Sequence, residues 1–354
     1  MKNRKTRYIL SFIFLLTFFN SLSYAVPPVT GSPRIDKPLS LYWEQDFIPA
    51  NPDLTTPSTN MVFDLHAQQS TCDIVLSTAG NYHMALRQLW HEYFLPANPA
   101  VKDWFYTTSP PVAEPQIENG ILTTGNWKGL CRPSIAVGPK GLMDNLDAKG
   151  FTLGERIPII QNQGNVILVK NGNPKSISSV WDLGKLDINV VTSNPDSEPG
   201  SFGNYSGSIY NIALNQPGPG TADELFERIF GIGSTKWLAG QRIHHREVPW
   251  AIAYGHADAG LMFYHLAVFA KRSFPDLFDI IPLGGTVRNP EPLAGNKIGK
   301  LFAVRITGNW TAEQELYREN LLAQYTSQTF SDILASHGLL RPPEFVLDDT
   351  KSLP

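Results

Sequence analysis

The chain has 354 residues, of which 42% are hydrophobic and 17% charged, and its formal net charge is −3. These values are typical of a globular protein and exclude a disordered chain. The slight negative charge and the lack of a basic block with interleaved aromatic residues argue against a nucleic-acid partner.

The first 25 residues have the pattern of a cleavable signal peptide. Residues 8–19 form an apolar run that is too short to span a bilayer, and Ser23-Tyr24-Ala25 is a small-x-small cleavage site. The segment before this run is positively charged, with Lys2, Arg4, Lys5 and Arg7. The alternative is an uncleaved membrane anchor, which the short run and the following Pro27-Pro28 disfavour. We therefore expect an exported protein of the periplasm.

Residues 26–72 are rich in Pro, Ser, Thr and Asn, which predicts an extended N-terminal arm. Cys72 and Cys131 are the only two cysteines. In an oxidising compartment we expect either a disulfide bond between them or two separate thiols, because the sequence does not give the distance between their Cα atoms. Two cysteines without a C-x-x-C pair argue against a metal cluster.

Further along, short apolar strands alternate with helices. Strands are predicted at residues 73–76, 103–106, 134–137, 165–170, 187–192, 259–264, 280–283 and 301–305. Helices are predicted at 82–94, 140–149, 177–183, 209–214, 222–229, 234–238, 311–326 and 328–337. This alternation predicts an α/β architecture with mostly parallel sheets, which bind ligands at the carboxyl ends of their strands.

No common catalytic motif accompanies these elements. The chain has no G-x-S-x-G elbow, H-E-x-x-H pair, Walker loop or dinucleotide fingerprint. Hydroxyl side chains instead follow the predicted strands. They are Ser77 and Thr78, then Thr108 and Ser109, and then Ser201 in a Gly-rich loop. Hydroxyls and the free amides of a helix N-terminus can hold an oxyanion without a countercharge. Simple capping and turn formation remain the alternative for each loop.

Two further features are candidates for ligand contacts. Neighbouring His244 and His245 cannot share one face of a helix or strand, so they do not imply a chelating pair, and we predict no metal and no cofactor. Arg246 is the better candidate, as a forked donor for an anionic ligand or for Glu247. Tyr264 follows a predicted strand and is expected either to close over a ligand or to pack in the core.

Four segments carry a resemblance to a known family: DIVLSTAG, PSIAVGPKGLMDNLDAKG, NVILVKNGNPKSISSVWDLGKLDINVVTSNPDSEPG and HADAGLMFYHLAVF. They resemble periplasmic (type II) extracellular solute-binding proteins near the molybdate-binding group, over residues 73–338. The resemblance implies two lobes, each a mostly parallel sheet flanked by helices, joined by two crossover strands. In such proteins hydroxyls and backbone amides of both lobes hold the oxyanion. The resemblance places these residues around the ligand: Ser77, Thr78, Thr108, Ser109, Gly200, Ser201 and either Phe263 or Tyr264.

The resemblance also implies the domain boundaries. The first lobe is expected at residues 73–161 plus 282–341, the second at 162–281, and a C-terminal tail at 342–354. Crossings are expected near 161–165 and 279–283, with the N-terminal arm wrapped around the first lobe.

The function that we expect is capture of a small anion by a monomer, without catalysis. The ligand would be a molybdate-like oxyanion or a small carboxylate, bound between the lobes and delivered to the membrane permease of an ABC-type transporter. Two alternatives stay open. One is an exported enzyme that uses His244 or His245 with Glu247 or Asp258 as acid–base groups. The other is a ligand-free interaction or sensing protein on the same fold.

Overall fold

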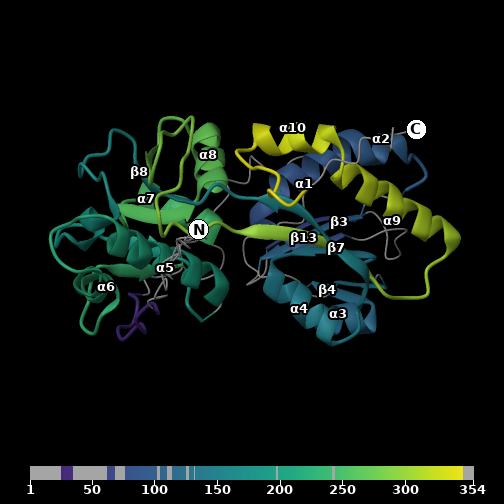
Figure 1. The fold of residues 1–354 in the computed structure, drawn as a ribbon, viewed down its shortest axis with the longest axis horizontal. Coiled ribbons are helices and arrows are strands. Elements are labelled where there is room, and N and C mark those ends of the chain that lie inside the picture. The colour runs from purple at the N-terminus through teal and green to yellow at the C-terminus, as the bar shows by residue number, and fades with distance from the viewer. Residues whose placement is uncertain are drawn as a thin grey trace, which may run out of the picture.

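The computed structural model describes residues 25–34, 62–67, 76–101, 104–109, 114–124, 127–130, 132–196, 198–240 and 244–345. These residues form two lobes side by side, each built around one large β-sheet with its own buried apolar cluster (Figure 1). Within this part of the chain, no helix is both long enough and apolar enough to cross a membrane. Both cysteines and nearly all of the predicted signal peptide lie outside the described residues, so the disulfide bond and the export signal stay predictions.

The first lobe contains a six-stranded sheet in the order β1-β3-β2-β6-β13-β7. Its strands are β1 (Val62–Ala67), β2 (Leu76–Ala79), β3 (Trp104–Ser109), β6 (Ile135–Gly138), β7 (Thr152–Gln161) and β13 (Lys300–Ile306). Its helical elements are η2 (Gly80–Tyr82), α1 (His83–Leu89), η3 (Trp90–Phe94), α2 (Leu95–Ala97), α3 (Glu114–Asn119), α4 (Lys140–Ala148), α9 (Ala312–Tyr325) and α10 (Gln328–Ser336). A small hairpin of β4 (Ile121–Thr124) and β5 (Trp127–Leu130) accompanies α3.

The second lobe contains a five-stranded sheet in the order β10-β9-β11-β8-β12. Its strands are β8 (Asn165–Lys170), β9 (Val190–Thr192), β10 (Trp237–Ala239), β11 (Ala259–Phe263) and β12 (Phe278–Pro282). Its helices are η4 (Val180–Gly184), α5 (Pro199–Asn215), α6 (Ala222–Phe230), α7 (His244–Ala253) and α8 (Tyr264–Ser273). Every residue of β9 and β11 is buried, which is why these strands read as continuous apolar runs.

Both sheets are mixed, so the prediction of mostly parallel sheets holds for only part of each sheet. The pairs β2–β3, β2–β6, β9–β10 and β9–β11 are parallel, whereas β6–β13, β7–β13, β8–β11 and β8–β12 are antiparallel. Apart from the antiparallel pair β1–β3, the antiparallel pairs involve the strands that lead the chain out of one lobe and into the other. A strand that enters a lobe through such a crossing runs in the direction opposite to the parallel strands that it joins.

The chain crosses between the sheets twice, after β7 and after β12, and two buried asparagines join these crossings. The Asn162 side chain accepts hydrogen bonds from the amides of Gly164 (3.1 Å) and Gly299 (2.9 Å). Asn296 accepts from the amide of Asn165 (2.8 Å) and donates to its carbonyl (2.9 Å). Each asparagine therefore ties one crossing to the other, and the two connections move as a unit.

The first described residues pack on the second lobe, not on the first lobe as expected. Gly31 donates its amide to the carbonyl of Phe230 (2.8 Å), and Arg34 donates to that of Trp237 (2.7 Å). Arg34 also forms an isolated parallel bridge with Leu238. These contacts cover the outer edge of β10, whose free backbone groups would otherwise face solvent.

Two helical predictions fail for identifiable reasons. Residues 234–238 were expected to be helical, but the described strand β10 starts at Trp237 and pairs with β9 in the core. The segment before residue 209 was expected to be a loop, but α5 begins at Pro199. Glycine and serine have low helix propensity, but in α5 the packing of buried residues favours the helix. At Gly207 a Cβ atom would lie 2.3 Å from Lys297 Nζ, so a larger residue would displace this lysine side chain from the helix.

Candidate functional site

A cavity of about 690 Å³ lies between the lobes and is lined by residues of both. It is bordered by the segments that follow β2, β6 and β11, and by the start of α5, which follows β9. The carboxyl ends of strands in both sheets therefore point at one space, the usual place for a ligand in an α/β protein. Figure 1 shows α4 and α5 on the same side of the crossing strand β13.

The N-terminus of α4 forms the first-lobe wall. Pro139 is its N-cap, and Pro139, Lys140 and Gly141 all line the cavity. The first intrahelical bond runs from the amide of Met143 to the carbonyl of Pro139 (3.2 Å), so the amides before Met143 have no acceptor within the helix. This helix end therefore presents amide donors and a partial positive charge to the cavity.

The N-terminus of α5 forms the opposite wall. Glu198 is its N-cap, and Glu198, Pro199, Gly200 and Ser201 line the cavity. The first intrahelical bond here is from the amide of Phe202 to the carbonyl of Glu198 (3.0 Å). Gly200 and Ser201 lie before that bond, so their amides, like those of α4, have no helical acceptor. The Ser201 side chain adds a hydroxyl beside them.

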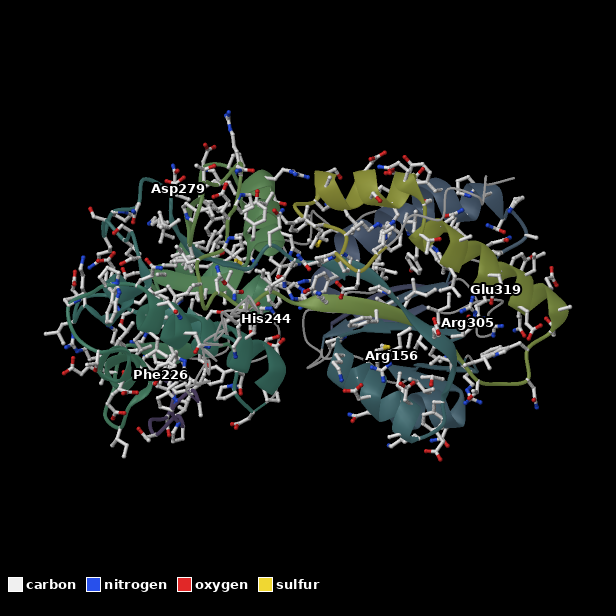
Figure 2. All side chains as sticks on the ribbon, in the orientation of Figure 1. Arg156, Phe226, His244, Asp279, Arg305 and Glu319 are labelled. Carbon is white, nitrogen blue, oxygen red and sulfur yellow. The ribbon has the colours of Figure 1, made fainter. Side chains whose placement is uncertain are left out.

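A buried acid stands beside this helix end. Glu198 is 5% exposed, and its carboxylate accepts hydrogen bonds from the backbone amide of His244 (3.0 Å) and from the Nδ1–H of the same residue (2.9 Å). The acceptor fixes Nδ1 as a donor, and Nε2 is buried without a partner among the described residues. Figure 2 shows His244 near the junction of the two lobes. One part of the cavity wall is therefore acidic, which restricts the ligands that fit.

Two aromatic rings cover the inner part of the cavity. Tyr82 and Phe263 both line it, with ring centroids 6.1 Å apart. Tyr82 is also stacked on His265 (4.8 Å) and accepts a hydrogen bond at its hydroxyl from Asn162 Nδ2 (3.0 Å). Burial raises the pKa of Tyr82 well above its usual value, so the phenol is neutral. Because Asn162 also joins the two crossings, this part of the site is tied directly to the hinge.

Two lysines of the first lobe line the cavity, and both are already paired. Lys140 Nζ lies 2.7 Å from Asp144, and Lys300 Nζ lies 2.7 Å from Glu344. Each ammonium charge is thus partly neutralised by an acid outside the lining. The amides and hydroxyl of the helix ends are the more directional donors for a ligand.

The structure brings together only some of the residues that the sequence suggested. Gly200 and Ser201 line the cavity. Tyr264 does not, since its hydroxyl donates to the carbonyl of Val287 (2.7 Å) and its neighbour Phe263 takes the place in the lining. Arg246 lies in a second, smaller cavity.

The hydroxyl residues of the first lobe lie within strands and not in the loops after them. Ser77 and Thr78 belong to β2, and Thr108 and Ser109 belong to β3, with Ala79 and Thr108 in register. Their side chains lie outside the described part of the chain, so a role in binding stays a prediction. Strand β2 leads directly into η2, and Asn81 of η2 lines the cavity.

Sequence reasoning missed several lining residues. Asn81 lines the cavity, and its buried Oδ1 has no partner among the described residues. Glu198 was overlooked, although an acid directly before Pro199-Gly200 is a recognisable helix start. No described group of three His, Cys, Asp or Glu residues could hold a metal ion.

Comparison with known proteins agrees with this geometry. Residues 134–296 match the family model of bacterial extracellular solute-binding proteins. A search of curated proteins finds no match. The fold is similar to that of the sulfate-binding protein SubI of Mycobacterium tuberculosis, with 13% identity, a TM-score of 0.52, and coverage of 79% of this chain and 88% of that one. It is also similar to the periplasmic molybdate-binding protein of Azotobacter vinelandii, with 16% identity, a TM-score of 0.50, and coverage of 76% and 99%.

At these identities the two structures show the fold, which is the predicted two-lobed α/β fold. The family is described as solute-binding, and the two structures are described as binding molybdate and sulfate. The predicted resemblance is confirmed at this level: residues 134–296 match the model of bacterial extracellular solute-binding proteins, and the fold is similar to that of two-lobed periplasmic binding proteins.

Proposed function

We propose that this protein is a periplasmic solute-binding protein that holds a small anion between its lobes for delivery to the permease of an ABC-type transporter. The observation that carries the proposal is the meeting of two helix N-termini, of α4 and α5, at one cavity from opposite lobes. Each helix end has a charge equivalent of about +0.5 and several unpaired amides. An anion between them would contact both lobes at once.

The charge pattern favours a singly charged ligand over a doubly charged one. Glu198 places a buried carboxylate next to the α5 amides, and like charges in a poorly solvated site repel strongly. A cavity of about 690 Å³ also falls in the range of sites that hold a whole organic molecule. Of the two ligand classes, a small carboxylate therefore fits these walls better than a molybdate-like dianion.

Binding would work by stabilising one arrangement of the lobes. The two crossings are joined by Asn162 and Asn296, so the lobes can turn about a short, well-defined hinge. A ligand that contacts α4 and α5 together favours the arrangement in which both helix ends reach it. That arrangement is the one that the permease would recognise.

A ligand screen tests the proposal. The chain without residues 1–25 is titrated by thermal shift and calorimetry with acetate, lactate, succinate, phosphate, sulfate, molybdate and tungstate. A ligand at 100 times its dissociation constant stabilises by about 2.7 kcal/mol, which corresponds to a shift of several degrees. A shift with a monocarboxylate supports the proposal in full, and a shift with an oxyanion alone contradicts the preferred class. If no anion changes the melting temperature, anion capture is wrong.

A further inference from the structure

A second cavity, of about 260 Å³, lies between helix α1 of the first lobe and helices α7 and α8 of the second. Figure 1 shows α1 and α8 on the other side of β13 from α4 and α5. Neither the matched family nor the expectations from the sequence assign a site here. Because both lobes contribute to its wall, this space depends on how the lobes are arranged.

Three helices each present one face to this cavity. His83 and Arg87 are one turn apart on α1, as are Arg246 and Trp250 on α7. On α8 the lining residues Leu266, Phe269 and Ala270 follow the same spacing. The cavity is therefore a space enclosed by packed helices, not a dent beneath a single loop.

The inner wall is aromatic. Trp250 lies 5.9 Å from Phe274 between ring centroids, at an interplanar angle of 59°. Phe269 meets the ring of His83 edge-on, at 6.3 Å and 75°. Tilted and edge-to-face contacts are the arrangements that aromatic groups prefer, and a further flat ring can join such a cluster in the same geometry.

The rim is cationic. Arg87 and Arg246 line the cavity from different lobes, and no described lining residue is acidic. A guanidinium has five N–H donors, so it can bind a carboxylate in addition to a protein partner. His245 also lines the cavity, and its buried Nδ1 has no partner among the described residues. A buried polar atom normally has a hydrogen-bond partner, and a ligand in this cavity would supply one.

We propose that this cavity is a second ligand site, for a small aromatic carboxylate whose ring lies among Trp250, Phe269 and Phe274 and whose carboxylate is held by Arg87 and Arg246. The volume is below that of sites for drug-sized ligands, about 300–1,000 Å³, so the ligand has a single ring. Burial and the neighbouring cations lower the pKa of His245 well below its usual value. This residue therefore acts as a neutral hydrogen-bonding group, and the arginines supply the charge. The site shares no lining residue with the larger cavity.

Calorimetric titration of the full chain without residues 1–25 tests this proposal, with benzoate and phenylacetate as probes and with the change Ser201→Asp in place, so that the larger cavity does not bind the carboxylates. Benzyl alcohol, which keeps the ring and loses the charge, and acetate, which keeps the charge and loses the ring, are the matched ligand controls. We expect saturable binding of at least one aromatic acid and at least tenfold weaker binding of both controls. Absence of binding by both aromatic acids at millimolar concentration, or equal binding of the controls, overturns the proposal.

Variants then locate the bound molecule. Arg246→Gln is expected to weaken binding about tenfold or more, because a charge-assisted hydrogen bond is lost. Phe269→Ala, at a side chain that is 44% exposed and therefore tolerant of change, is expected to weaken it several-fold. Arg228→Gln, an exposed arginine on α6, is expected to leave it unchanged. Unaltered binding in folded Arg246→Gln and Phe269→Ala proteins contradicts the assignment. If Arg246→Gln fails to fold, Phe269→Ala decides alone.

Discussion

Nδ1 of His244 lies 2.9 Å from Oε1 of Glu198, where the start of α7 meets the N-terminus of α5. Glu198 also accepts the backbone amide of His244, so one buried carboxylate joins two helix starts. Its charge is favourable for α5, because an acid near a helix N-terminus complements the positive end of the dipole. The same charge is unfavourable for an anion in the cavity. The Glu198 carboxylate therefore stabilises the fold and weakens anion binding.

Glu198→Gln is expected to separate these two effects. The amide keeps the shape but loses the charge-assisted hydrogen bonds, which lowers the free energy of unfolding by about 1.5–3 kcal/mol. The affinity for a bound anion rises about fivefold or more, since about 1 kcal/mol of repulsion corresponds to that factor. Urea unfolding measures the first effect and calorimetry the second. Glu155→Gln, at an exposed position of β7, is the control and changes neither. Weaker anion binding in Glu198→Gln would show that the carboxylate contacts a donor on the ligand.

The fold was largely predictable because most strands are short apolar runs with clear boundaries. Strand β8 agrees with its predicted range of 165–170, and the terminal helix pair is also found. The start of α5 was not predictable in the same way. Its first residues are small and polar, and tertiary contacts hold this part of the helix: Phe202 stacks on Trp237 of β10 (5.5 Å), and Lys297 donates to the carbonyl of Gly203 (2.9 Å). The local sequence pattern does not indicate such tertiary contacts.

The site was predictable only at the level of its helix ends. Ser201 was identified as a hydroxyl in a Gly-rich loop, and Gly200 was placed at the ligand by the family resemblance; both line the cavity. Arg246 was recognised as a donor for an anion, but sequence could not say that α7 turns it toward a different cavity. Tyr82 and Lys300 come from segments far apart in the chain, and only the crossings bring them to the same space.

Ser201→Asp is expected to abolish anion binding while the protein stays folded. An acid in the first turn of a helix stabilises it by about 0.3–1 kcal/mol, so the melting temperature should not fall. Placed in the cavity wall, the same charge repels the ligand, and affinity should drop about 100-fold, since some 3 kcal/mol of repulsion is plausible for a poorly solvated pair. Thr329→Asp, in the first turn of α10, adds the same charge away from the cavity and should leave binding intact. Equal binding by both variants would place the ligand elsewhere.

Asn162→Ala is expected to destabilise the hinge. The change removes hydrogen bonds to the amides of Gly164 and Gly299 and to the hydroxyl of Tyr82. Loss of partners for buried amides costs about 1–3 kcal/mol for each group, so we expect a decrease of about 2–4 kcal/mol in urea unfolding. Small-angle scattering should also show a broader range of lobe arrangements. Asn145→Ala, at an exposed position of α4, is the control. A variant as stable as that control would mean that the crossings are held by other contacts.

Acid is expected to destabilise the protein through the buried His265. Its Nε2 lies 2.9 Å from the carbonyl of Asn81, and its ring is stacked on Tyr82. Burial lowers its pKa to about 3, and the neighbouring His83, His244 and His337 act in the same direction. In the unfolded chain the pKa is about 6.5. Between these values the unfolded state binds one more proton, so stability is complete above pH 6.5 and falls toward pH 3 by about 1.4 kcal/mol per pH unit.

His265→Gln should remove this part of the pH dependence, because glutamine can still donate to the Asn81 carbonyl but does not titrate. Urea midpoints at pH 7, 6, 5 and 4 measure the slope, which should decrease by about one proton relative to the unchanged protein. His337→Gln is a second variant, for which we expect a smaller change in the slope. Burial lowers the pKa of His337 as well, but its ring is less enclosed, so its slope should decrease less. An unchanged slope in His265→Gln would mean that His265 takes up its proton without unfolding, and that the contact with Asn81, and so this edge of the larger cavity, opens in mild acid.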